Sequence, residues 1–351
     1  MTCNSASDQL ILGIETSCDE TAAAVVQAGR HVLSSIIASQ EQIHSLFGGV
    51  VPEIASRKHT ELLVVVVQRA LNDAGVTWGD LGGIAVTNGP GLIGSLLVGV
   101  SAAKAYHIAT GLPLVGVNHL QAHVAANFAD ICRQPLSEQS LPAVCLVASG
   151  GHSDIVLIAG PTDYGVLAVT RDDAAGEAFD KAARVLQLGY PGGPAIAEAA
   201  QTGDPQTFDF PRPRVGDTLD FSFSGLKTAL VRQVEALQRD GEPVTDPASQ
   251  TVADLAAGFQ AAVVDTLVRN TMQAVEKQAV SHLAIAGGVA ANRLLRERLG
   301  VQCDRAGVQL HCPPSELCTD NAVMVAIAGH HLLLARGPDD LDLDVFSAMP
   351  R

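Results

Sequence analysis

Three short apolar runs separated by polar turns occur twice in this sequence. The first set covers residues 10–14, 22–26 and 32–37, and the second covers residues 143–148, 154–158 and 166–169. Short apolar runs bounded by Gly, Asp, Ser and Pro are typical of strands joined by turns. A longer helical stretch follows each set, at 56–74 and at 177–188. The repetition therefore predicts two similar α/β lobes, each beginning with a β-β-β unit.

The boundaries of these lobes follow from the polar stretches of the chain. The most polar, proline-containing stretch in the middle lies near 130–141, so we expect an N-terminal lobe over 1–140 and a C-terminal lobe over 141–320. Two further polar stretches, near 202–220 and 235–250, predict surface insertions in the second lobe. We expect the closing helix, 321–336, to pack back on the first lobe.

Charge and composition exclude several classes of protein. The chain has 22 Lys and Arg residues against 37 Asp and Glu residues, a formal net charge of −15, which excludes a basic nucleic-acid-reading domain as the whole protein. The apolar run at 62–67 is far shorter than the ~20 residues of a membrane span, and the N-terminus has no signal-peptide pattern. Seven cysteines without a C-x-x-C pair predict reduced thiols. We expect a cytoplasmic protein without membrane association.

Two histidines are spaced so that one metal ion can bind both. His119 and His123 stand at positions i and i+4, which share one face of a helix. Two protein ligands rarely suffice, and Asp320, at the start of the closing helix, is a candidate for the third. The alternative is an ordinary pair of histidines on a helix without a metal. Position 120 is Leu where a zincin peptidase needs Glu as general base, so a metallopeptidase is disfavoured.

Several glycine-rich turns follow predicted strands. The turn at Ser149, Gly150 and Gly151 exposes backbone N–H groups that can bind an anion, and Asn292 opens a helix after a second glycine turn. Neither G-x-G-x-x-G nor G-x-x-x-x-G-K-[ST] occurs, so Rossmann and P-loop sites are both excluded at the motif level. The turn that contains Asp19 and Glu20 is suited to holding a metal or orienting a nucleophile. Each turn is equally compatible with a plain hairpin.

These features together resemble the TsaD family, also called Gcp or YgjD, the tRNA N6-adenosine threonylcarbamoyltransferases. The resemblance runs from residue 10 through the closing helix. The matching motifs are 13–21 (GIETSCDET), 88–91 (NGPG), 118–123 (NHLQAH), 149–152 (SGGH), 172–181 (DDAAGEAFDK), 190–194 (YPGGP), 221–227 (FSFSGLK), 286–292 (AGGVAAN) and 319–321 (TDN).

The resemblance implies a two-lobed actin/hexokinase/Hsp70-like (ASKHA) fold. It also implies transfer of a threonylcarbamoyl group from threonylcarbamoyl-AMP to N6 of adenine 37 in tRNAs that read ANN codons. One divalent metal, Fe²⁺ or Zn²⁺, would be held by His119, His123 and Asp320. The residues that would bind the donor are Val147, Ala148, Ser149, Gly150, Gly151, Asp180, Gly193 and Asn292. Many relatives carry Asp where this chain has Ala197. The implied protein partners are of the TsaB and TsaE types, and a separate TsaC-type synthase would make the adenylate.

The implied chemistry leaves the proton acceptor open. The donor is a mixed anhydride with a reactive carbonyl and an anionic leaving group, so the site needs anion stabilisation more than a nucleophile of its own. Asp19 and Glu20 are our candidates for assisting loss of the adenine N6 proton. A small-molecule kinase of the same fold is the main alternative, but it would not explain His119, His123 and Asp320 together. A binding subunit without activity would be expected to have lost these three side chains.

Overall fold

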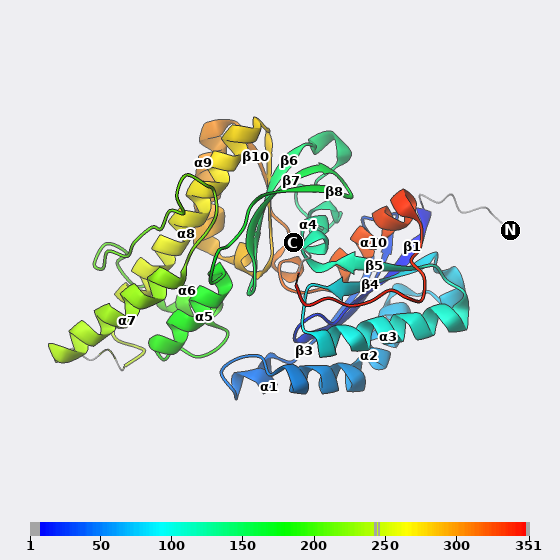
Figure 1. Ribbon diagram of the computed structural model, residues 1–351, viewed down its shortest axis with the longest axis horizontal. Helices are drawn as coiled ribbons and strands as arrows, with labels where there is room; N and C mark the ends of the chain where they lie inside the picture. Colours follow the sequence, from blue (N-terminus) through cyan, green and yellow to red (C-terminus); the bar gives the residue numbers. More distant parts are fainter. Residues whose placement is uncertain (1–7, 242–243, 245, 349–351) are drawn as a thin grey trace. The chain divides into compact units, whose positions relative to one another are not determined.

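The computed structural model describes residues 8–241, 244 and 246–348 (Figure 1). The described chain forms two compact units. The first contains the residues up to 141 together with 160–164 and those from 311 onward, and the second contains 142–159 and 165–310. The expected lobe boundaries at 140 and 320 stay a prediction, and the compact units differ from them in placing 311–320 with the first unit. Residues 1–7, on which the signal-peptide argument partly rests, lie outside the described residues, as do three residues of the 235–250 stretch.

The first unit contains a five-stranded sheet in the order β3-β2-β1-β4-β5. Strand β1 pairs antiparallel with β2 and parallel with β4, β2 pairs antiparallel with β3, and β4 pairs parallel with β5. The strands are β1 (Leu10–Glu15), β2 (Glu20–Gln27), β3 (His31–Ser39), β4 (Gly83–Gly89) and β5 (Leu114–Asn118). The carboxyl ends of β1, β4 and β5 therefore meet at one edge of the sheet, where Glu15, Thr87 and His119 are found.

The second unit repeats this arrangement. Its sheet has the order β10-β9-β6-β7-β8, with β6 antiparallel to β7 and parallel to β9. The strands are β6 (Ala143–Ala148), β7 (Ser153–Gly160), β8 (Asp163–Ala168), β9 (His282–Ala286) and β10 (Gln309–His311). Strands β6 to β10 thus occupy the positions that β1 to β5 occupy in the first sheet. The predicted duplication of the β-β-β unit is confirmed.

Helices cover both faces of the first sheet (Figure 1). Side chains alternate between the faces of a strand. Leu12 and Ile14 lie in a core cluster with residues of α2 (Pro52–Ala74) and α3 (Ile93–Thr110). The glycine between them, Gly13, points to the opposite face.

Helix α10 (Ala322–Arg336) packs on that opposite face, against β1, β2, β4 and β5. A Cβ placed on Gly13 would lie 2.2 Å from the carbonyl oxygen of Ala322, and one placed on Gly329 would lie 2.2 Å from Cβ of Ala85. These two glycines therefore allow α10 to approach the sheet more closely than any side chain would permit. Two shorter helices complete the unit, α1 (Glu41–Ser45) and α4 (His119–Ala125), and α4 contacts α10.

The second unit is built around one long buried helix. Helix α8 (Gln250–Gln278) contacts the other helices of the unit and strand β6. The surrounding helices are α5 (Ala175–Val185), α6 (Gly192–Ala199), α7 (Ser224–Arg239) and α9 (Arg293–Ala306). By length and composition alone α8 would also pass as a membrane span, yet 83% of its most apolar window is buried, as in a core helix.

A carboxylate distant in sequence caps α7. Asp172 accepts hydrogen bonds from the backbone N–H groups of Phe223 and Ser224 and from the hydroxyls of Ser222 and Ser224. Burial would raise the pKa of Asp172, but these donors outweigh it and hold the pKa below its usual value. The interaction joins the segment before α5 to the start of α7.

The six cysteines in the described residues are free thiols, as expected.

Candidate functional site

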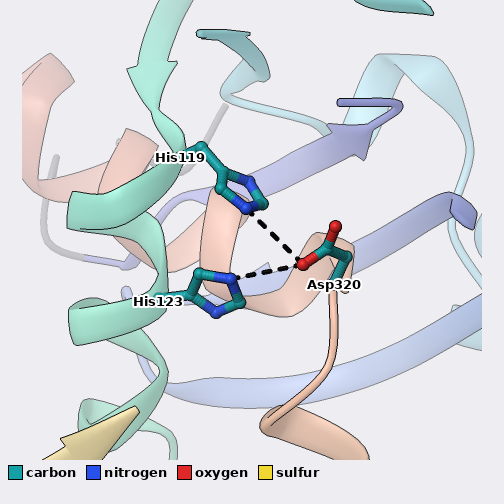
Figure 2. Close-up of side chains that lie close together, drawn as sticks. All are labelled: His119, His123 and Asp320. Carbon is teal, nitrogen blue, oxygen red and sulfur yellow. Dashed lines mark ion pairs between the residues drawn. The ribbon is translucent and has the colours of Figure 1, made fainter. Parts of the chain in front are cut away.

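His119, His123 and Asp320 converge within the first unit (Figure 2). Nε2 of His119 and Nε2 of His123 lie 3.5 and 3.2 Å from the same oxygen, Oδ1 of Asp320. Both histidines come from α4, whose first turn is capped by Asn118 through bonds from the N–H groups of Leu120 and Gln121. Asp320 lies immediately before Asn321, the residue that caps α10.

The three side chains fit a divalent metal ion. Two ligands bound at about 2.1 Å in a tetrahedral arrangement lie about 3.4 Å apart, close to the two distances found here. His123 is fully buried; its Nε2 faces Asp320, and its Nδ1 has no hydrogen-bond partner among the described residues. A buried ring nitrogen without a partner is costly unless something binds it. Asp320 keeps 19% of its side chain exposed, so the cluster is open on one side.

Glu15 lies on the other side of His119. Its Oε2 is 3.2 Å from Nδ1 of His119, and Ser17 Oγ lies at the same distance from that nitrogen. Burial would lower the pKa of His119, but Asp320 and Glu15 outweigh it and raise that pKa to about 9. For Glu15, burial would raise the pKa, but the charge and hydrogen bond of His119 hold it below the ordinary value. Burial and the neighbouring His119 lower the pKa of His123.

Of the two catalytic candidates, Asp19 lies in the turn between β1 and β2 and Glu20 is the first residue of β2; Glu20 lies close to Asp320. Burial, followed by the charges of Asp320 and Asp19, raises the pKa of Glu20 to about 9. Ser39 donates a hydrogen bond to Glu20 at 3.2 Å, and the backbone carbonyl of Asp19 accepts one from Gln40. Several carboxylates thus lie close together, and a cation would relieve their mutual repulsion.

A buried histidine holds this turn in place, a role that the sequence argument did not assign. Nε2 of His59 lies 3.0 Å from the carbonyl oxygen of Cys18, so this nitrogen is the donor. Nδ1 then accepts from the hydroxyl of Thr21 at 2.8 Å. Burial lowers the pKa of His59, which favours the neutral ring that this pattern requires. The sequence likewise assigns no role to Glu15, which stands at the end of an apolar run and within the motif 13–21.

The predicted donor-binding residues lie in the second unit. Val147 and Ala148 end β6, and the turn from Ser149 to Gly151 follows. The N–H groups of Gly176 and Glu177, in the first turn of α5, donate to the carbonyls of Ser149 and Gly150. A Cβ on Gly150 or Gly151 would meet nothing within 4 Å, so these two exposed glycines leave their backbone accessible.

Of the remaining three donor-binding candidates, Asp180 and Gly193 lie on helices and Asn292 immediately precedes one. Asp180 of α5 accepts a hydrogen bond of 2.7 Å from the N–H of Gly192 at the start of α6, next to Gly193. Asn292 caps α9 by accepting from Leu295 N–H, and it donates to Gln260 of α8 at 2.9 Å. Asp180 and Asn292 therefore both stabilise helix starts. The 3₁₀ turn Gly288–Ala291 contacts β6, α5 and α9, so the structure brings these segments together at one end of the second sheet.

Solved structures with a similar fold include two of HypF. Full-length HypF in its phosphate- and nucleotide-bound form superposes with a TM-score of 0.58 at 14% identity, over 95% of this chain and 57% of HypF. HypF from T. kodakarensis gives a TM-score of 0.61 at 15% identity, over 93% of this chain and 48% of HypF. At these identities the likeness concerns the fold alone. Together with the two sheets of equal strand order, it confirms the predicted ASKHA-like class.

Curated relatives are much more similar in sequence. The proteins named tRNA N6-adenosine threonylcarbamoyltransferase from Symbiobacterium thermophilum and Desulfitobacterium hafniense are each 52% identical to this chain and cover 96% and 92% of it. The protein of the same name from Thermomicrobium roseum is 50% identical over 97% of this chain. Each alignment spans at least 92% of the relative. The TsaD family model, described as tRNA N6-adenosine threonylcarbamoyltransferase, matches residues 31–327. This chain belongs to the TsaD family of tRNA N6-adenosine threonylcarbamoyltransferases.

Proposed function

We propose that this enzyme transfers the threonylcarbamoyl group from threonylcarbamoyl-AMP to N6 of adenine 37 in tRNAs that read ANN codons. The observation that carries the proposal is near-full-length similarity, at about half identity, to transferases of that name. The product is N6-threonylcarbamoyladenosine, t6A. A small-molecule kinase or a metallopeptidase is not favoured, since the relatives are named as transferases and Leu120 stands where a zincin has Glu.

The proposed cofactor is one divalent metal ion, Fe²⁺ or Zn²⁺, held by His119, His123 and Asp320. The proposal is supported by two imidazole nitrogens and a carboxylate oxygen lying within 4.8 Å of one another. When bound, such an ion supplies a Lewis acid for a phosphate or carbonyl oxygen of the donor. Imidazole and carboxylate ligands suit both iron and zinc.

The protein's own groups have separate proposed tasks. The backbone of Val147–Gly151 would bind the anionic part of the adenylate, supported by the accessible Gly150 and Gly151. Asp180, Gly193 and Asn292 would hold the rest of the donor. Water or another side chain would make the contact that Ala197 cannot. Asp19 and Glu20 would assist loss of the proton from N6, supported by their place beside Asp320, and Glu20, whose pKa is raised to about 9, would do so only in its ionised form.

The proposed partners are a tRNA and further proteins. A chain with a net charge of −15 cannot by itself neutralise many tRNA phosphates. We therefore propose that it acts in the cytoplasm within a complex with TsaB-type and TsaE-type proteins, which would add basic surface or order the site. The adenylate would come from a separate TsaC-type synthase.

Reconstitution tests this function directly. Purified protein, supplied adenylate and unmodified tRNA are combined with and without the partner proteins, and t6A in digested tRNA is measured by mass spectrometry. We expect t6A at adenine 37, formed in multiple turnovers only when the partners are present, and loss of product with His123→Ala. Absence of t6A in the complete mixture would contradict the proposed transfer, whereas sustained turnover by the isolated chain would contradict only the need for partners.

A further inference from the structure

A fully buried carboxylate lies directly behind the proposed metal centre. Glu15 ends β1 with none of its surface exposed, and each carboxylate oxygen has a partner. Oε1 accepts from the backbone N–H of Ser17 at 2.6 Å. Oε2 accepts from the hydroxyl of Thr87 at 2.7 Å and lies 3.2 Å from Nδ1 of His119. Residues from β1, the following turn, β4 and α4 thus converge on one charged group, which fixes its position.

The contact with Glu15 determines which way the His119 ring presents its nitrogens. An ionised carboxylate can only accept hydrogen bonds, so Nδ1 of His119 is the donor in this pair. The opposite nitrogen, Nε2, lies 3.5 Å from Oδ1 of Asp320. A neutral imidazole carries one proton, on either Nδ1 or Nε2. When Glu15 holds that proton on Nδ1, the lone pair of Nε2 points toward Asp320.

The second histidine of the cluster has no such support. Nε2 of His123 lies 3.2 Å from Asp320, while Nδ1, on the other side of the ring, has no hydrogen-bond partner among the described residues. Metal-binding histidines usually donate the N–H of the other ring nitrogen to a carboxylate or carbonyl, which fixes the tautomer and makes the ligand more basic. In the part of the chain that the structure describes, His119 has that arrangement and His123 does not.

We propose that Glu15 is a positioning residue that holds His119 with its proton on Nδ1 and its Nε2 free to bind the metal. The proposal rests on the metal centre proposed above and concerns a residue outside the His119, His123 and Asp320 set. Thr87 has an indirect part, since it holds the carboxylate of Glu15. Ser17 holds Glu15 through its backbone N–H, and its Oγ also lies 3.2 Å from Nδ1 of His119. Glu15 is not expected to touch the metal or the substrate.

A purely structural role for Glu15 predicts a different result. In that case the carboxylate only satisfies the N–H of Ser17 and the hydroxyl of Thr87, and its replacement would lower stability without changing metal affinity in the folded protein. The two roles are separated by measuring metal binding itself.

The decisive experiment is a Zn²⁺ competition titration against a chromogenic chelator, using the full chain. Glu15→Gln keeps the size of the side chain, and we expect Zn²⁺ affinity to fall about 10- to 100-fold. Asp172→Asn is the matched control, because it removes a hydrogen-bonded carboxylate of the second unit and should leave the affinity unchanged. His123→Ala should abolish binding and thereby tests the metal centre separately.

Each outcome decides the proposal. Glu15→Gln affinity within twofold of wild type, with His123→Ala defective, would overturn the role of Glu15 and leave the metal centre standing. Wild-type affinity in His123→Ala would overturn both. If Glu15→Gln does not fold, the wild-type protein loaded with Zn²⁺ is decisive. Long-range ¹H–¹⁵N NMR should show His119 bound through Nε2 with a proton on Nδ1, and binding through Nδ1 would refute the proposal.

Discussion

Replacing Gly13 with alanine adds one methyl group at the closest contact between β1 and α10. The added Cβ would lie 2.2 Å from the carbonyl oxygen of Ala322, 2.7 Å from the backbone nitrogen of Ala326 and 2.9 Å from its Cβ. Two of these three atoms are backbone, so a rotamer change cannot relieve the contact. Helix α10 must move away from the sheet.

The displacement of α10 determines how much stability the protein loses in Gly13→Ala. Inserting a methylene group into a well-packed core costs typically 1–3 kcal/mol, and a backbone clash places Gly13→Ala in the upper part of that range, at about 2–3 kcal/mol. For a domain of about 150–250 residues, this corresponds to a loss of about 4–12 °C in Tm. Since Asp320 stands two residues before α10, the same movement should displace its carboxylate from His119 and His123 and weaken Zn²⁺ binding about tenfold.

Calorimetry of the metal-free protein and the chelator titration measure the two effects of Gly13→Ala. Gly79→Ala is the matched control in the same unit, because its Cβ would meet only Thr77 Oγ1 at 3.8 Å and should change stability by no more than about 0.5 kcal/mol. Equal Tm values for Gly13→Ala and Gly79→Ala would refute the packing argument. A lower Tm with wild-type Zn²⁺ affinity would refute the coupling between α10 and the metal centre.

Three further predictions concern pH and helix caps. Zn²⁺ affinity should rise by up to about tenfold per pH unit between pH 7 and 9. The pKa of about 9 leaves His119 protonated at pH 7, so the metal must displace that proton. Zn²⁺ affinity that does not change with pH in the chelator titration would contradict this prediction. Asp172→Asn should cost about 1–2 kcal/mol at pH 7 in urea unfolding. The lowered pKa means that this contribution exists above the unfolded-state pKa of about 3.9 and disappears as pH falls through the folded value, so mutant and wild type should converge in acid. Asn292→Ala should lose about 1 kcal/mol as an N-cap, and calorimetry should show weaker binding of a stable donor analogue; a variant with normal stability and affinity would exclude both roles.

The sequence predicts the strands of the two β-β-β units better than strands β4 and β5. The runs at 10–14 and 22–26 lie within β1 and β2, and both are bounded by polar turns that mark their ends. The sequence does not identify strands β4 and β5, because a strand buried on both faces is a short continuous apolar run that cannot be told from a buried helix segment. Helix α2 begins at Pro52, four residues before the expected start, where proline is suited to the first helical turn.

The sequence predicts only those residues of the candidate site that share a helical spacing or belong to a family motif. Spacing alone indicates that His119 and His123 share a face of α4, while Asp320 is indicated by its place at the start of the closing helix and by the family motif. The contact between Glu15 and His119 joins residues 104 positions apart. It depends on the pairing of β1, β4 and β5, and no local pattern in the sequence contains that information.

The origin of Asp320, far along the chain from His119 and His123, has a consequence for synthesis on the ribosome. Asp320 follows His123 by about 200 residues, so at about 5–20 residues per second the histidines emerge roughly 10–40 s before their carboxylate partner. During that interval α10 is also missing, and the face of the first sheet that contains Gly13 and Ala85 lacks its covering helix. A chain terminated before residue 320 retains both histidines but neither the carboxylate nor the helix. Occupancy of the proposed metal centre therefore distinguishes complete chains from truncated ones.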